Sequence, residues 1–314
     1  MPTATTSRRS DGLTHPLDPT DRLLIIFWGL LSAVNLAFHS RIPFWKEIVA
    51  ANIIAAVLVW VLACASCARP SRVLRCLHDW TTFLLVLFTY KQLYYMIGPI
   101  HQGKDYDQLL LWLDHLLFRV NPTEWLAGFT NRYLTEVLQI AYSLFYVLFL
   151  AVGFELYQKD LPGFRYFRFT IVYGFLISYV GYFFLPAAGP RFTLHDFSRI
   201  DTELPGILFA PALRWFINMF ESIPQGVSNS VALACAQRDV FPSGHVMMTL
   251  VAIVLACQHR LKVRGYAFVI GMLLIFATVY LRYHYLVDIL AGALLAPVCL
   301  LTADRVYTLF ADEQ

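Results

Sequence analysis

One short motif combines a helix start with a histidine, which could bind and process an anion. Pro242-Ser243-Gly244-His245 stands directly before an apolar run, and proline suits the first position of a helix. Free backbone N–H groups at a helix start, together with the Ser243 hydroxyl, favour a phosphate-like group, and Gly244 lets the backbone approach it. A helix-capping serine alone would explain Ser243 but not His245 beside it. The motif therefore predicts an anion site with a histidine next to it.

A second motif pairs a histidine with a carboxylate. His284 and Asp288 are four residues apart, so on a helix they share a face. The carboxylate can hold the proton of one ring nitrogen, which leaves the other as a nucleophile or base. Such a pair can also be purely structural, but Arg191 in the cluster Gly189-Pro190-Arg191 adds a cation for phosphate. Together, the three clusters favour catalysis.

The elements that must position these residues are membrane helices. Of the 314 residues, 58% are hydrophobic and 14% charged, against roughly 45–50% and 25% in soluble domains. Since lipid satisfies no backbone hydrogen bond, apolar runs near the ~17–25 residues that span a bilayer are expected to be helices. Eight such runs occur, at residues 23–38, 48–68, 80–100, 134–156, 169–185, 241–257, 265–281 and 285–303. The sequence predicts an all-α polytopic membrane helix bundle with about eight transmembrane helices.

The distribution of basic residues predicts the orientation. Lys and Arg concentrate in alternate loops, which is typical of the cytoplasmic side. These residues are Arg8, Arg9, Arg22, Arg69, Arg72, Arg75, Lys159, Arg165, Arg168, Arg260, Lys262 and Arg264. Both termini are therefore expected in the cytoplasm, and the loops 101–133 and 186–240, with all three polar clusters, on the opposite face. We expect the inner or plasma membrane of a bacterium.

Each long loop contains an amphipathic stretch. Leucines recur at helical spacing over residues 109–120, with Asp107, Asp114 and Arg119 on other faces, which suits a helix in the outer interface. Residues 213–220 repeat the pattern more weakly, and packing of either segment on the bundle is the alternative. The expected division is a flexible tail (1–21), N-terminal helices with the interfacial helix (22–133), a catalytic core (134–304) and a C-terminal tail (305–314).

The motifs resemble those of the type 2 phosphatidic acid phosphatase superfamily of lipid phosphatases and phosphotransferases. Its patterns are Lys, six residues, Arg-Pro; then Pro-Ser-Gly-His; then Ser-Arg, five residues, His, three residues, Asp. The second pattern is complete at residues 242–245, and His284 and Asp288 match the third. The resemblance covers residues 170–300 and implies a six-helix phosphatase core, here preceded by two more helices.

The departures from these patterns concern the cationic phosphate ligands. Phe184 and Phe192 replace the Lys and the Pro of the first pattern, and Ala277 and Thr278 replace the Ser-Arg of the third. Arg282, two residues before His284, is a candidate substitute. The Gly-Pro-Arg form and the residues 277–288 look more like the branch of inositol phosphorylceramide synthases, although that branch usually has a larger residue at the position of Gly244.

The resemblance also implies residue roles. His284 would attack phosphorus to form a phosphohistidine, Asp288 would fix its tautomer, and His245 would act as general acid and then base. Arg191, Ser243 and Gly244 would hold the phosphate oxygens. We expect no cofactor and no metal, because these motifs lack the carboxylate cage that magnesium prefers.

Lys91 is a further candidate substrate-binding residue. It stands near the middle of the third apolar run, where a charge costs about 2.5–3.5 kcal/mol. Either it contacts a lipid head group or it pairs internally with an acid such as Glu136 or Glu155.

Three functions remain open. The first is a phosphatase that hydrolyses a lipid phosphate of phosphatidate or isoprenyl (di)phosphate type. The second is a phosphotransferase with a lipid alcohol such as ceramide as acceptor, and the third a non-catalytic lipid-binding or transport protein. A net charge of +3 gives no sign of a nucleic-acid partner. The six cysteines lack the spacing of a disulfide framework or a zinc site, and Cys64 and Cys67, which resemble a redox pair but end an apolar run, are expected to be buried structural thiols.

Overall fold

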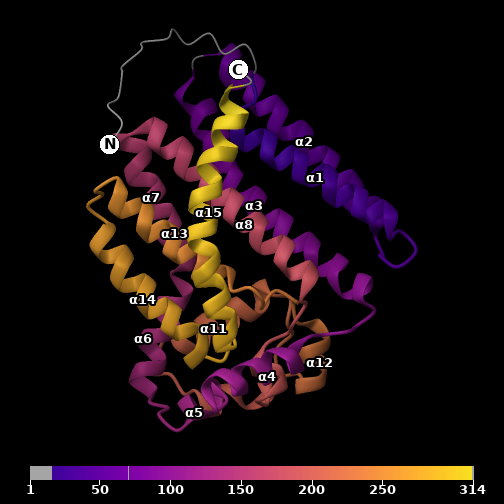
Figure 1. The fold of residues 1–314 in the computed structure, drawn as a ribbon, viewed down its shortest axis with the longest axis vertical. Coiled ribbons are helices and arrows are strands. Elements are labelled where there is room, and N and C mark those ends of the chain that lie inside the picture. Colours follow the sequence, from indigo (N-terminus) through magenta and orange to yellow (C-terminus); the bar gives the residue numbers. More distant parts are fainter. Residues whose placement is uncertain (1–15, 70, 313–314) are drawn as a thin grey trace.

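Helices account for all the regular structure in the part of the chain that the computed structural model describes, residues 16–69 and 71–312 (Figure 1). Every predicted apolar run forms a helix. The corresponding helices are α1 (Pro19–Ala37), α2 (Trp45–Ala68), α3 (Arg72–His101), α6 (Arg132–Ser143) with α7 (Phe145–Lys159), α8 (Leu161–Phe184), α13 (Gly244–Gln258), α14 (Arg264–Tyr280) and α15 (Leu286–Asp312). The predicted all-α polytopic bundle is confirmed.

Not all of these helices are long enough to cross a bilayer alone. By length and composition, α1, α2, α3, α8 and α15 qualify, and α6 with α7 forms a sixth candidate span that is bent by 49°. The two shorter apolar helices α13 and α14 have 15 and 17 residues. At 1.5 Å per residue, α13 reaches about 22 Å, less than the ~30 Å hydrocarbon core. These criteria therefore support five or six spans rather than eight.

The helices α8, α13 and α15 form the centre of the bundle. Helix α13 packs against α15, α14 and α8, while α14 also packs against α6. Helices α1 and α2 pack on each other and flank α3 on one side of the molecule (Figure 1). The start of α1 and the end of α15 lie at one end of the bundle, and the short loop helices lie at the other (Figure 1).

The two long loops fold into short helices. They are α4 (Asp107–Phe118), α5 (Pro122–Ala127), α9 (Pro190–Thr193), η1 (Phe197–Arg199), α10 (Ile200–Glu203), α11 (Ala210–Phe220) and α12 (Asn229–Cys235). Helices α4 and α11 lie where the amphipathic pattern predicts them. The acids of α4 do not face water, as they would on an ordinary amphipathic surface helix. Asp107 and Asp114 are buried, while Leu116 and Leu117 are exposed.

The expected tails are shorter than the sequence suggested. Residues 1–15, with Arg8 and Arg9, and residues 313–314 lie outside the described residues. Asp18 caps α1 by accepting hydrogen bonds from the N–H groups of Thr20 and Asp21, and Pro19 occupies the first turn. This capping sequence makes residues 19–21 helical, and residues 305–312 continue α15.

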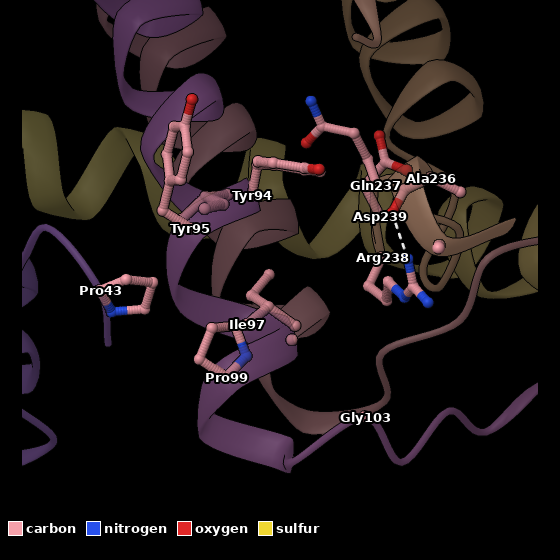
Figure 2. A pocket seen from close by; sticks show the side chains of 13 residues that line it. Pro43, Tyr94, Tyr95, Ile97, Pro99, Gly103, Ala236, Gln237, Arg238 and Asp239 are labelled. Carbon is pink, nitrogen blue, oxygen red and sulfur yellow. Dashed lines mark hydrogen bonds between the residues drawn. The ribbon is translucent and has the colours of Figure 1, made fainter. Parts of the chain in front are cut away.

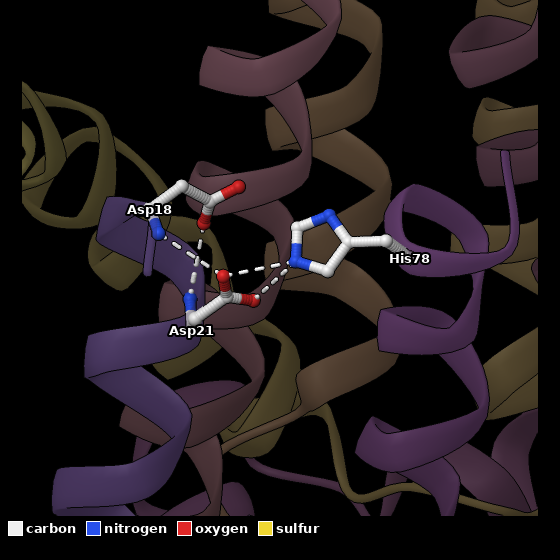
Figure 3. A group of neighbouring side chains, drawn as sticks. All are labelled: Asp18, Asp21 and His78. Carbon is white, nitrogen blue, oxygen red and sulfur yellow. Dashed lines mark hydrogen bonds and ion pairs between the residues drawn. The ribbon is translucent and has the colours of Figure 1, made fainter. Parts of the chain in front are cut away.

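Buried ionic contacts join three helices at the end of the bundle near the termini. Arg168 of α8 pairs with Asp18 and, at 2.8 Å, with Asp79 of α3, and His78 lies 2.9 Å from Asp21 (Figure 3). Ligand atoms of Asp18, Asp21 and His78 lie within 4.8 Å of one another, a spacing that could hold a metal ion. The capping N–H groups and Arg168 already use the Asp18 oxygens, so the cluster is explained as a link between α1, α3 and α8.

Candidate active site

The three polar clusters predicted from the sequence meet at the end of the bundle opposite this ionic cluster. The backbone N–H of Ser243 donates to the carbonyl of Asp288 at 3.1 Å, and that of Arg191 donates to the carbonyl of Arg282 at 3.0 Å. Residues about 50 and 90 positions apart are thus joined by main-chain hydrogen bonds. Side chains from all three clusters are held in one place by the backbone.

Two histidine rings face each other at this place. Nε2 of His284 lies 3.5 Å from Nδ1 of His245. His284 is buried and stands in the short turn between α14 and α15, so it precedes the helix that carries Asp288. Sequence spacing alone placed both residues on one helix. The turn still brings them together, because the first turn of α15 starts at Leu286.

Asp288 lies on the other side of the His284 ring. Its Oδ2 is 3.4 Å from His284 Nδ1, longer than a hydrogen bond, and it accepts the N–H of Tyr285 at 2.9 Å. His284 Nδ1 and Asp288 Oδ1 are both buried without a hydrogen-bond partner. Catalytic hydrogen bonds are often long without substrate and tighten in the complex. A small ring movement would let Nδ1 donate to this carboxylate.

Arg191 brings a buried cation to the histidines. Its guanidinium lies over the rings of Tyr283, at 4.7 Å, and Phe192, at 4.6 Å. One terminal nitrogen pairs with Glu221, and the buried Nε has no partner. An unpartnered N–H on a buried guanidinium is a donor that a phosphate oxygen can satisfy.

The Pro-Ser-Gly-His segment contains the N-terminus of α13, as predicted, but the helix begins at Gly244, so Pro242 precedes it and does not occupy its first position. Ser243 is the N-cap and accepts the N–H of Val246 at 3.3 Å. A Cβ atom on Gly244 would come within 2.5 Å of the Tyr182 hydroxyl. The small size of Gly244 therefore admits Tyr182 of α8, whereas the sequence had suggested the approach of a ligand.

Aromatic rings pack around His245. Tyr142 stacks on His245 at 4.9 Å and on Tyr283 at 4.2 Å, and Phe145 lies 4.3 Å from His245. Tyr142 and Phe145 lie at the bend between α6 and α7, and Tyr283 lies in the turn before His284. The bend thus places an aromatic wall against the histidine. Tyr142 thus packs directly on a candidate site residue, His245.

Two acids of α4 hold the loops that carry the candidate site residues. Asp107 accepts the N–H groups of Ala188 and Gly189, at 2.9 and 2.8 Å, and the Tyr285 hydroxyl at 2.8 Å. Asp114 accepts the N–H groups of Leu286 and Val287 at the start of α15, at 3.0 and 2.7 Å. Sequence reasoning missed both roles. Their spacing of seven, which places them on one helix face, was the available signal.

The other two candidate cations have different partners. Arg282 donates to Glu203 at 2.5 Å. Lys91 contacts the Phe220 carbonyl and the Ser222 hydroxyl. The expected internal partners of Lys91 are wrong. Glu136 instead accepts N–H groups of residues 207–210, and Glu155 those of residues 262–263, because both acids cap helix starts.

Two further acids lie near Arg191, and no sequence pattern identified them as candidate site residues. Glu221 pairs with Arg191, and Asp239 accepts the Tyr90 hydroxyl at 2.6 Å. Burial raises the pKa of both carboxyl groups, and Arg191 opposes the shift in each case. Several acidic side chains therefore lie around the candidate site. Among them, the carboxylates of Asp107 and Asp114 already accept hydrogen bonds from backbone N–H groups.

The arrangement contains the groups that phosphoryl transfer requires. A buried imidazole lies between a carboxylate and a second imidazole, and a guanidinium with a free donor lies over the adjacent tyrosine. These groups can act as nucleophile, orienting partner, proton carrier and charge stabiliser.

Comparison with known proteins agrees with this interpretation of the site. The search of curated proteins and the search of solved structures found no match. A family model described as the PAP2 superfamily matches residues 108–302, more than half of the chain, and this range contains His245, His284, Asp288, Arg191 and all of helix α4 except Asp107. The chain belongs to the PAP2 superfamily.

Proposed function

We propose that the protein is a lipid phosphate phosphatase that works through a phosphohistidine at His284. PAP2 membership supports phosphatase or phosphotransferase activity in general. The observation that carries the specific assignment is the buried His284, with Nε2 at 3.5 Å from His245 and Nδ1 at 3.4 Å from Asp288. The substrate class is a phosphatidate or an isoprenyl (di)phosphate.

In the first step, His284 Nε2 attacks phosphorus and the bond to the lipid oxygen breaks. His245 gives its proton to the departing oxygen, and Asp288 holds Nδ1–H as the ring becomes positive. In the second step, a water oxygen attacks phosphorus, its proton passes to His245, and the P–N bond breaks. Phosphate leaves, and both histidines return to their starting state.

We assign the phosphate oxygens to Arg191 and the Ser243 hydroxyl, and for the Gly244 N–H to join them a phosphate oxygen must replace the Tyr182 hydroxyl beside it. The unpartnered Nε of Arg191 and the start of α13 favour negative charge at one place. For Arg282 and Lys91 to bind substrate, phosphate oxygens must replace Glu203 and the Phe220 carbonyl, respectively. The reaction is expected to proceed without a metal ion.

An alcohol acceptor in place of water gives the second candidate function, a lipid head-group phosphotransferase. A cavity between α3 and the segment leading to Ser243 favours this alternative (Figure 2). The chemistry at His284 is identical, and only the group that attacks the phosphohistidine changes. A non-catalytic lipid-binding or transport role has no observation of its own in its favour.

Phosphate release tests the proposal. Purified protein in detergent is given lipid phosphates and a metal chelator, with and without ceramide or diacylglycerol. We expect free phosphate from wild type and a loss of at least 10³-fold in His284→Ala, with activity retained in His39→Ala, an exposed histidine. A new phospholipid formed only with acceptor would support the transferase, and full activity in His284→Ala would contradict both.

A further inference from the structure

A cavity of ≈ 350 Å³ lies between α3 and the segment that precedes Ser243 (Figure 2). Tyr94 and Tyr95 line it from α3, and Gln237, Arg238 and Asp239 line it from the opposite wall. Its other lining side chains are mainly apolar, including those of Leu93, Ile97 and Pro99. A space of this size accepts a small molecule or one head group.

An unpartnered buried donor belongs to this cavity. Gln237 is 4% exposed, and its Nε2 makes no hydrogen bond. Figure 2 shows the Gln237 amide extending from its wall toward α3, with the Tyr94 hydroxyl opposite it. A buried N–H group without a partner costs about 1–3 kcal/mol. A ligand oxygen in the cavity would remove this cost.

The cavity wall continues into the proposed phosphoryl site. Asp239 lines the cavity and accepts the Tyr90 hydroxyl at 2.6 Å. The next residue, Val240, packs in one cluster with Tyr285, the neighbour of His284, and the Pro-Ser-Gly-His segment begins two residues further on. A group bound in the cavity therefore lies beside the phosphoryl site.

The charges of the wall select against ionic ligands. Arg238 is already neutralised by Asp105, with two contacts of 3.1 Å. Asp239 disfavours an anion, and an ammonium group has no acceptor atom to offer Gln237 Nε2, which would stay unsatisfied. A hydroxyl group can donate to Asp239 and accept from Gln237 at once.

We propose that this cavity binds a neutral polyhydroxylated group, a polyol, beside the phosphoryl site. The proposal rests on the proposed function and specifies the group at that site. The polyol is either a free acceptor or the head group already attached to phosphorus. As acceptor, its hydroxyl oxygen attacks phosphorus, its proton passes to His245, and the P–Nε2 bond breaks to give a polyol phosphate.

The case in which the polyol is a free acceptor is tested by measuring how the phosphoryl group is divided between polyol and water. Protein in detergent micelles receives a phosphatidate and increasing glycerol or myo-inositol, and the ratio of polyol phosphate to free phosphate is measured. This ratio does not depend on the amount of folded enzyme. We expect a saturable ratio that falls at least fivefold in Gln237→Leu at subsaturating polyol, but not in Gln92→Leu, a buried α3 glutamine outside the cavity lining.

The case in which the polyol is the head group of the donor lipid is tested with phosphatidylglycerol as donor. Free glycerol should then compete with the donor, and Gln237→Leu should weaken this competition at least fivefold. Competition without polyol phosphate formation from phosphatidate identifies the head group. A ratio that rises linearly and equally in wild type and Gln237→Leu, with no competition, overturns the cavity assignment.

Binding without turnover separates this proposal from the proposed function. The Tm of detergent-solubilised wild type and Gln237→Leu is measured over the same polyol range, so that general polyol stabilisation cancels in the difference. We expect a saturable excess shift in wild type. If this shift occurs but no donor is turned over, the proposed function fails and the polyol site stands. If turnover occurs without the shift or the partition effect, the polyol site fails.

Discussion

His284 is the residue on which the account depends, and its surroundings set its charge. It lies in the turn between α14 and α15. Burial lowers its pKa well below the ordinary value, His245 and Arg191 add to this shift, and the Val240 backbone opposes it. A nucleophilic imidazole must be unprotonated, so this environment favours its role.

The first prediction is that His284 stays neutral in mild acid. An ordinary histidine with a pKa of about 6.5 is roughly nine-tenths protonated at pH 5.5. Because a lowered pKa requires more acid for protonation, the His284 ring should remain neutral at pH 5.5. Histidine ¹³C NMR of labelled protein in micelles, with the signal assigned through His284→Gln, measures this. A midpoint at or above pH 6.5 would refute the prediction.

Residue types predicted more of the site than spacing did. The sequence identified His245, His284, Asp288 and Arg191, which the fold brings to one place. It could not show that Tyr182 occupies the space beside Gly244, because this contact joins α8 to α13. Of the two alternatives for Lys91, the internal pairing with Glu136 or Glu155 is wrong, since both acids bind backbone N–H groups far along the chain.

Helix α4 shows how one element positions residues from two others. Its buried acids bind the loop before Arg191 and the start of α15, so α4 spans two of the three polar clusters. A periodicity argument finds the helix but not its orientation. In a membrane protein apolar side chains can face outward to lipid and acids inward to backbone donors, which reverses the pattern of a soluble helix.

The second prediction concerns Asp114 as a positioning residue. Asp114→Ala leaves the N–H groups of Leu286 and Val287 without their acceptor, at about 1–3 kcal/mol each. The first turn of α15 should shift, and with it Asp288 and His284. We expect kcat to fall 10- to 100-fold with a smaller change in KM. Steady-state kinetics with a lipid phosphate measures both parameters.

Rescue distinguishes positioning from general destabilisation. Asp114→Asn keeps one acceptor oxygen and should recover part of kcat, while Leu116→Ala, an exposed position on the same helix, should keep full activity. Equal kcat in Asp114→Ala and wild type would contradict the role of α4.

At the scale of the whole molecule, the site and the basic loops lie at opposite ends of the bundle. Arg22, at the start of α1, donates to the Phe310 carbonyl near the end of α15, whereas Asp288 stands in the first turn of α15. The 27-residue length of α15 separates the two ends. From the positive-inside pattern we therefore propose that the site lies at the extracytoplasmic face.

The third prediction is this orientation. In a variant whose native cysteines are replaced, Gln225→Cys lies between α11 and α12, and Lys262→Cys lies between α13 and α14. Both positions are exposed. A membrane-impermeant maleimide should label Gln225→Cys in intact cells and Lys262→Cys only after permeabilisation. The reverse labelling pattern would place the site in the cytoplasm and contradict the proposed topology.

Trapping the covalent intermediate tests the central claim most directly. The protein is mixed with ³²P-labelled lipid phosphate, quenched in alkali, where phosphohistidine survives, and digested for mass spectrometry. We predict phosphate on His284, none in His284→Gln, and accumulation in His245→Gln with an activated donor, because the second step lacks its base. Phosphate on another residue, or undiminished labelling in His284→Gln, would contradict the account.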